Sequence, residues 1–125
     1  MNLKVLIVDD DFINRKLLQA LLKKYPEIVR ETIEAENGSE ALAIIKEDVG
    51  INLVLLDIIM PVLDGKEFLK IFRSDSTNSN IPVLVLTTDD TQKTAIYELG
   101  ADDFLLKPIN EDELLQKIRK WAPEV

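Results

Sequence analysis

The chain has 125 residues, enough for one domain of ordinary size with a single hydrophobic core. Its 15 basic and 23 acidic residues give a net charge of −8, and such a surface repels nucleic-acid phosphates and anionic lipid headgroups. We therefore expect no direct binding to nucleic acid or to a membrane. The sequence contains no histidine and no cysteine, which excludes a phosphohistidine in this chain, a thiolate metal site and a disulfide framework.

The apolar stretches have the length of strands, so we expect no segment that spans a bilayer. The first predicted strand begins at Leu3, which leaves no room for a signal peptide. A cytoplasmic location is the prediction that agrees with these features.

Apolar runs of strand length alternate with helix-like segments, which predicts βα units around a parallel sheet. The run over 51–57 is apolar almost throughout and is predicted as the central strand, whereas the polar run over 30–35 is predicted as an edge strand. The remaining strands are expected over 3–8, 82–86 and 103–106, and helices over 12–25, 37–47, 66–74, 91–99 and 110–121, with a polar connection over 76–80. Five βα units fill the chain, so we predict an α/β fold, a single-domain doubly wound (βα)5 sandwich.

Polar residues follow four of the predicted strands at their carboxyl ends. Asp9 and Asp10 follow the first strand, and Asp57 ends the third. Thr87 follows the fourth strand and Lys107 follows the fifth. Ligands and chemistry gather outside the carboxyl ends of an open parallel sheet, so these side chains are expected to converge at one edge.

The three aspartates predict a metal site. Carboxylates that meet raise one another's pKa unless a cation lies among them, and hard oxygen ligands suit Mg²⁺. Taken alone, the run Asp9 to Asp11 has a simpler explanation, which is negative charge at a helix N-terminus. Together with Asp57, the same residues favour the metal site.

Asp57 ends the most apolar strand, where an unpaired carboxylate is unfavourable. A carboxylate nucleophile that accepts a phosphoryl group explains its position, and Asp64, just before Gly65, is the better candidate for a simple helix cap. Lys107 can bind a phosphoryl oxygen, or pair with Asp57 when no phosphate is present. Thr87 can donate a hydrogen bond to another phosphoryl oxygen. Considered singly, a surface lysine and a β-branched strand residue are the commoner interpretations of these two positions.

Four stretches, taken together and in order, resemble the receiver domains of response regulators in two-component signalling. They are Val8-Asp9-Asp10, the segment from Leu56 to Gly65, Leu86-Thr87-Thr88, and the segment from Phe104 to Pro108. The resemblance extends from about residue 3 to residue 121. It implies the flavodoxin-like strand order 2-1-3-4-5 that the family member CheY has.

The resemblance also implies a role for each site residue. Asp57 is then the phosphoacceptor. Mg²⁺ is bound by Asp57, by Asp10 directly, by Asp9 mostly through water, and by the backbone carbonyl of Ile59. In the same way, Thr87 and Lys107 hold the phosphoryl group.

A conformational switch is implied as well, with Thr87 and Phe104 as its residues. A sensor histidine kinase or a histidine phosphotransfer protein phosphorylates Asp57, the phosphoryl group attracts the Thr87 hydroxyl, and Phe104 moves inward. The surface formed by the fourth helix, fifth strand and fifth helix then changes for a downstream protein target. Tyrosine is frequent at the position of Phe104, so the resting ring is expected to be held outward less strictly here. The family further implies a cis peptide bond between Lys107 and Pro108.

On this interpretation the chain is a regulatory phosphoacceptor and not an enzyme, and it acts as a monomer or as a phosphorylation-dependent dimer. Residues 1–125 are expected to form one receiver domain without an output domain. Two alternatives stay open: a receiver fragment of a hybrid kinase or larger regulator, and a pseudo-receiver that binds partners without phosphorylation. An aspartyl phosphohydrolase is disfavoured, because the dehalogenase type needs a second aspartate where this chain has Ile59.

The first predicted helix has an apolar arc, from Ile13 round to Leu22, that is wider than core packing usually needs. A thick core stripe is one explanation. The other is that Phe12, Ile13 and Leu17 dock on a kinase or phosphotransfer helix bundle. The stretch from Asp10 to Leu18 is also similar to receivers attached to hybrid kinases.

Overall fold

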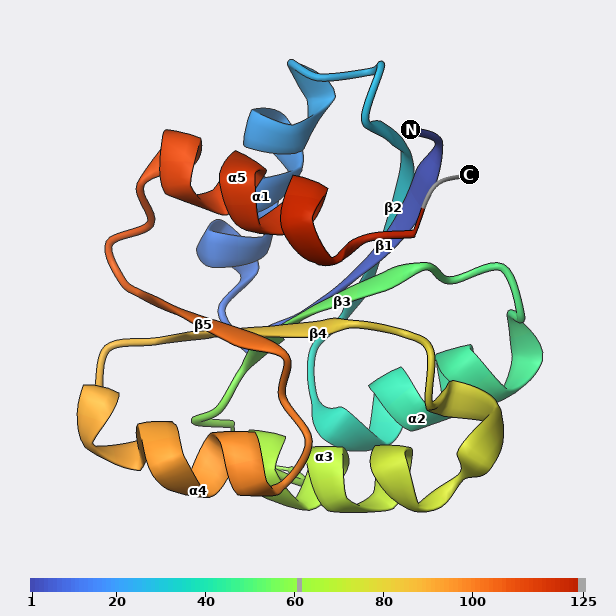
Figure 1. The fold of residues 1–125 in the computed structure, drawn as a ribbon, viewed down its shortest axis with the longest axis vertical. Helices are drawn as coiled ribbons and strands as arrows, with labels where there is room; N and C mark the ends of the chain where they lie inside the picture. Colours follow the sequence, from blue (N-terminus) through green and yellow to red (C-terminus); the bar gives the residue numbers. More distant parts are fainter. Residues whose placement is uncertain (61, 124–125) are drawn as a thin grey trace.

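The computed structural model describes residues 1–60 and 62–123. Its strands form one parallel sheet in the order β2-β1-β3-β4-β5, as predicted (Figure 1). Because the two central neighbours β3 and β4 are buried along their whole length, their sequences are apolar without alternation. The strands are β1 (Leu3–Val8), β2 (Val29–Ala35), β3 (Leu53–Asp57), β4 (Val83–Thr87) and β5 (Asp103–Leu106).

Helices cover both faces of this sheet. Figure 1 shows α1 and α5 on one face and α2, α3 and α4 on the other. The helices are α1 (Phe12–Lys23), α2 (Gly38–Glu47), α3 (Gly65–Ser74), α4 (Lys93–Glu98) and α5 (Glu111–Trp121), with two short 3₁₀ helices, η1 (Ser76–Asn78) and η2 (Asp90–Gln92). No helix in the described part of the chain is long and apolar enough to cross a membrane.

Two hydrophobic clusters fill the space between the sheet and its helices. Alternate residues of β1 enter opposite clusters, because successive strand side chains point to opposite faces. Leu6 packs in the cluster that contains Phe68 and Phe72 of α3, and Ile7 packs in the cluster that contains Leu22 of α1. Burial of large side chains on both faces is the main stabilising contribution to this fold.

Asparagine and aspartate begin the four longer helices. Asp11, Asn37, Asp64 and Asn110 each accept a hydrogen bond from a backbone N–H of the first helical turn. The prediction that Asp64 is a helix cap is therefore confirmed. Of the three aspartates after β1, only Asp11 caps the helix that follows. Asp9 and Asp10 lie in the cluster of carboxylates that includes Asp57.

The largest departure from the predicted elements lies between β4 and β5. A continuous helix was predicted over 91–99, but the structure has η2 followed by the six-residue α4. Asp89 accepts hydrogen bonds from the backbone and hydroxyl of Thr91, which favours a tight turn at this point. Gly100 follows α4 with a φ of 109° and ends it, as its position predicted. The other element ends agree with the predictions or differ from them by at most two residues.

Candidate functional site

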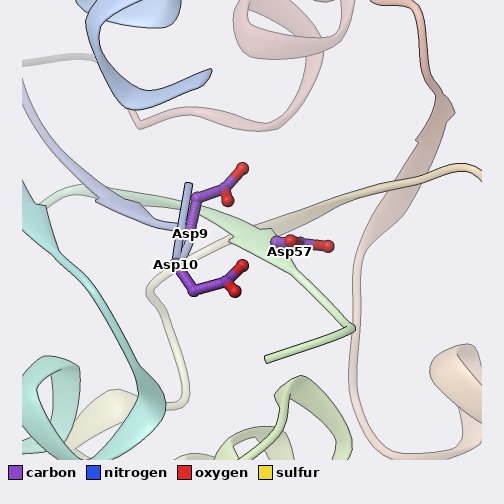
Figure 2. Close-up of side chains that lie close together, drawn as sticks. All are labelled: Asp9, Asp10 and Asp57. Carbon is purple, nitrogen blue, oxygen red and sulfur yellow. The ribbon is translucent and has the colours of Figure 1, made fainter. Parts of the chain in front are cut away.

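Three carboxylates converge where β1 and β3 end. Asp9 and Asp10 follow β1, and Asp57 is the last residue of β3, so the adjacent parallel strands bring them to one edge of the sheet. One carboxylate oxygen from each lies within 4.8 Å of the others. In Figure 2 the carboxylates of Asp9 and Asp10 extend toward the side on which that of Asp57 lies. The predicted convergence of these residues is confirmed.

Asp9 is almost fully buried and is held at several of its polar atoms. Its N–H donates to the Ala35 carbonyl at 3.1 Å, and its Oδ1 accepts the N–H of Asp11 at 2.9 Å. Its Oδ2 lies 3.3 Å from the ammonium of Lys107. These contacts fix the turn between β1 and α1, so Asp9 has a defined orientation toward the edge of the sheet.

The Asp57 carboxyl is buried beside the other two. Burial raises its pKa to about 6, the Lys107 charge opposes that rise, and the charges of Asp9 and Asp10 add to it. Oδ1 accepts the N–H of Ile59 at 3.3 Å, and Oδ2 lies 3.7 Å from Lys107. The charged form of Asp57 is therefore disfavoured mainly by its removal from water, and Lys107 compensates only in part.

Lys107 reaches the acidic cluster from the loop after β5. Its N–H donates to the Thr87 carbonyl at 2.8 Å, which ties this loop to the end of β4. The predicted pairing with Asp57 is present, although the ammonium lies closer to Asp9. The peptide bond between Lys107 and Pro108 is cis, as predicted.

Thr87 and Phe104 lie on neighbouring strands and are both buried. The Thr87 hydroxyl accepts the N–H of Asp89 at 3.3 Å, and Thr87 is paired with Leu106 across β4 and β5. Phe104 packs in the cluster that contains Ile96 of α4, and the Lys93 ammonium lies 5.7 Å from the centre of its ring. The ring is therefore in an inward position, and its predicted role as a switch residue stays a prediction.

Ile59 has an exposed side chain, 65% accessible, and contacts the site through its backbone. The predicted use of its carbonyl as a metal ligand stays a prediction.

Arg15 contacts this site and was not identified from the sequence. It lies in the first turn of α1, and its Nη1 donates to the carbonyl oxygen of Asp9 at 2.7 Å. Its Nε donates to Glu34 Oε1 at 3.0 Å. A signal was present, because Arg15 precedes Leu18 and Leu22 by three and seven positions and so shares their buried face. A charge on such a face indicates a specific polar partner.

The apolar arc of α1 is only partly explained by the core. Leu18 and Leu22 are buried, but Phe12, Ile13 and Leu17 are 57%, 61% and 63% exposed. The explanation as a thick core stripe is therefore wrong for these three residues. Leu17 lines a groove of about 310 Å³ between α1 and the loop after β5. Its walls are mostly apolar, and Asp9, Asn14 and Lys107 also line it.

The donor set fits a hard divalent cation. Carboxylate oxygens without thiolate or imidazole neighbours are the ligands that Mg²⁺ prefers. Burial is the main reason for the raised pKa of Asp57, and a cation among the three carboxylates would offset both this burial and the repulsion from Asp9 and Asp10.

Comparison with known proteins gives the family. The model of the response regulator receiver domain family matches residues 5–119, which is nearly the whole chain. The chain belongs to this family, whose members are the receiver domains of two-component signalling.

Two curated relatives cover almost all of this chain. PilH of Pseudomonas aeruginosa is 34% identical over 117 residues, which are 92% of this chain and 93% of PilH. A transcriptional regulatory protein of Haemophilus influenzae, a CpxR homologue, is 44% identical over 119 residues, which are 93% of this chain and 48% of that protein. The chain thus spans most of one relative and about half of the other.

Solved structures show the same fold. The response regulator TrrA of Thermotoga maritima, in complex with Mg²⁺-BeF, matches with a TM-score of 0.83 and 32% identity. The match covers 95% of this chain and 98% of TrrA.

Proposed function

We propose that this chain is a phosphoacceptor domain in which Asp57 receives a phosphoryl group from the phosphohistidine of a partner protein. The observation that carries the proposal is the convergence of Asp9, Asp10, Asp57 and Lys107 at one edge of the sheet. The partner is a sensor histidine kinase or a histidine phosphotransfer protein, because this chain contains no histidine of its own. The chain alters its own state and transforms no external substrate, so it is a regulatory domain and not an enzyme.

In the transfer step a carboxylate oxygen of Asp57 attacks the phosphorus, and a new O–P bond forms. The P–N bond to the histidine breaks, its electron pair stays on the ring nitrogen, and the ring takes up a proton from solvent. The Lys107 ammonium and the Thr87 hydroxyl bind oxygens of the transferred group. Lys107 can do this without a large movement, because it lies 3.7 Å from the Asp57 carboxylate.

Mg²⁺ is the cofactor of the proposal. Asp9, Asp10, Asp57 and the Ile59 carbonyl would hold it, Asp9 mostly through water. When bound, it neutralises negative charge on the carboxylates and on the phosphoryl oxygens. TrrA, which has a related sequence and the same fold, is known in complex with Mg²⁺-BeF, which supports this assignment.

The switch of the proposal joins Thr87 to Phe104. Movement of the Thr87 hydroxyl toward the phosphoryl group changes the space beside Phe104, which lies in the same hydrophobic cluster as Ile96 of α4. The surface formed by α4, β5 and α5 then changes for a downstream protein target. Phe104 is buried in this structure, and we expect the phosphoryl group to favour this inward position of the ring.

The experiment that tests the phosphoacceptor role is intact mass spectrometry after incubation with acetyl phosphate. We expect the wild-type chain to gain one phosphoryl group in the presence of Mg²⁺ and none in its absence. The variant Asp57→Asn should gain none under either condition. A folded wild-type protein that gains no phosphoryl group and binds no beryllofluoride would overturn the proposal in favour of a pseudo-receiver.

Partner docking is proposed on Phe12, Ile13 and Leu17, which are exposed apolar residues of α1. Leu17 also lines the groove next to this helix. A helical phosphotransfer partner can cover them while its histidine reaches Asp57. The same role applies in a stand-alone regulator, a larger regulator or a hybrid kinase. The matched region is nearly all of PilH but only about half of the CpxR homologue, so relatives include both short and longer proteins. The absence of cysteine suits a cytoplasmic setting for such a domain.

Leu17→Ser tests this docking surface. We expect the rate of phosphoryl transfer from a kinase that phosphorylates the wild-type chain to fall about tenfold, because an interface residue near the centre contributes about 1–2 kcal/mol. Phosphorylation by acetyl phosphate should be unchanged. Val49→Ser is the matched control, since Val49 is 96% exposed in the loop between α2 and β3. Equal transfer rates for all three proteins would contradict the assignment.

A further inference from the structure

We propose that Arg15 is a positioning residue for the metal site, holding the backbone of Asp9 so that the carboxylates of Asp9 and Asp10 stay within reach of Asp57. This inference rests on the proposed function. Its basis is a buried guanidinium whose hydrogen bonds join the turn after β1 to the end of β2.

The first step of the argument is the contact itself. The Arg15 side chain is 11% exposed, and its Nη1 lies 2.7 Å from the Asp9 carbonyl oxygen, a distance typical of a hydrogen bond from a charged donor. The same guanidinium donates through Nε to Glu34, which precedes the last residue of β2. Two donors of one rigid planar group therefore bind two different segments.

The second step concerns the peptide unit that Arg15 binds. The carbonyl of Asp9 and the N–H of Asp10 belong to one planar peptide group, so fixing the carbonyl direction also fixes the plane that joins the two aspartates. On the other side of Asp9, its N–H is bound to the Ala35 carbonyl at the end of β2. The backbone of Asp9 is therefore held on both sides, by Ala35 through its N–H and by Arg15 through its carbonyl oxygen.

The third step separates position from charge. Arg15 is ion-paired with Glu34, whose second oxygen lies 2.8 Å from Lys16. The hydrogen bond from Lys16, followed by that from Arg15, lowers the pKa of Glu34, so the carboxylate is charged at neutral pH. The charge of Arg15 is therefore offset beside it. Its effect on a metal ion comes mainly from the orientation of the Asp9 peptide.

Position and charge predict opposite results for a metal titration. If Arg15 acts by position, Arg15→Gln and Arg15→Lys both weaken Mg²⁺ binding, because neither side chain reproduces the two-donor fork. If its charge dominated, Arg15→Gln would tighten Mg²⁺ binding by removing a cation, and Arg15→Lys would resemble the wild type. The double variant Arg15→Gln with Glu34→Gln removes both charges and should bind Mg²⁺ as weakly as Arg15→Gln alone.

The experiment is a titration of each purified protein with MgCl₂, followed through backbone amide NMR shifts, which also report whether each variant is folded. We expect the Kd for Mg²⁺ to rise about tenfold in Arg15→Gln and Arg15→Lys, as for other groups that orient metal ligands. The difference from wild type should persist at high salt, where long-range charge effects are screened. Phosphorylation by acetyl phosphate should approach the wild-type rate once Mg²⁺ saturates the variant.

Two matched controls distinguish this role from general destabilisation. Lys16→Gln removes the other ion pair of Glu34 without removing the bond to Asp9. Arg73→Gln removes a second largely buried arginine, which donates to the carbonyls of Gly100 and Asn78 at the opposite end of α3 from the site. Both controls should bind Mg²⁺ with a Kd close to that of the wild type.

An unchanged Kd in folded Arg15 variants, or an equal rise in Arg73→Gln, would overturn the inference and leave the proposed function standing. Tighter Mg²⁺ binding in Arg15→Gln would overturn it as well, in favour of a charge effect. Failure of the wild-type chain to bind Mg²⁺ would overturn the proposed function, and the inference with it.

Discussion

Replacement of Asp57 by asparagine is expected to stabilise the metal-free protein by about 2 kcal/mol at neutral pH, although it removes the proposed phosphoacceptor. Burial and the charges of Asp9 and Asp10 raise the pKa of Asp57 from 3.8 to about 6, against the opposing charge of Lys107. A shift of this size corresponds to about 3 kcal/mol, which we reduce because part of the carboxyl group is screened by solvent. Asparagine has nearly the same shape and no charge, and Lys107 keeps its closer partner Asp9.

The pH dependence of this difference follows from the direction of the shift. The folded state holds the Asp57 proton more tightly than the unfolded state, so the favourable contribution is complete below about pH 4 and is lost as the pH rises through about 6. The wild-type protein and Asp57→Asn should therefore have similar free energies of unfolding near pH 4, and the variant should be the more stable at pH 7. Carboxyls such as Glu34, whose pKa is lowered, act in the opposite direction but are present in both proteins.

Urea unfolding of the two proteins in a metal-free buffer, at pH 4.5 and pH 7, measures this difference. Added Mg²⁺ should stabilise the wild type and narrow the difference in stability, because a bound cation stabilises the buried Asp57 carboxylate in its charged form. Equal stabilities at pH 7 would contradict the raised pKa of Asp57.

Replacement of Phe104 by alanine is expected to lower the free energy of unfolding by about 3–4 kcal/mol and to uncouple the site from the α4, β5 and α5 surface. The ring is 6% exposed and lies in the hydrophobic cluster that also contains Ile96 of α4, so truncation leaves a cavity in this cluster. It also removes the contact of the ring with the Lys93 ammonium. Alanine has no ring to fill the inward space, so we expect movement of Thr87 to cause no further change at the α4, β5 and α5 surface.

The coupling is measured as the change in amide NMR shifts of α4 and α5 when beryllofluoride and Mg²⁺ are added. We expect these shifts to shrink strongly in Phe104→Ala and partly in Phe104→Leu, which leaves a smaller cavity. Leu105→Ala is the matched control. Leu105 is the next residue of β5 and is also buried, but it belongs to the other hydrophobic cluster, which contains residues of α1 and α5. The Leu105→Ala protein should be less stable than the wild type, but its α4 and α5 amide shifts should still respond to beryllofluoride and Mg²⁺. Full coupling in a folded Phe104→Ala protein would contradict the switch role.

Much of the fold and of the site could be predicted from the sequence by itself. The apolar runs, their lengths and the polar residues that end them are local properties, and these predict parallel strands whose carboxyl ends bring Asp9, Asp57 and Lys107 together. Helix caps such as Asp64 are also local, because the partner N–H lies within three residues. The strand order itself was implied by the resemblance to the receiver family.

Contacts between segments distant in the chain were decided by the tertiary structure. Arg15 meets Glu34 because β2 lies beside β1, a pairing across 19 residues that helical spacing in α1 does not reveal. The exposure of Leu17 depends on how much of α1 packs against the sheet. The inward position of Phe104 depends on the space between β5 and α4. Sequence periodicity determines which side chains share a face of an element. How that face is covered depends on the elements that pack against it.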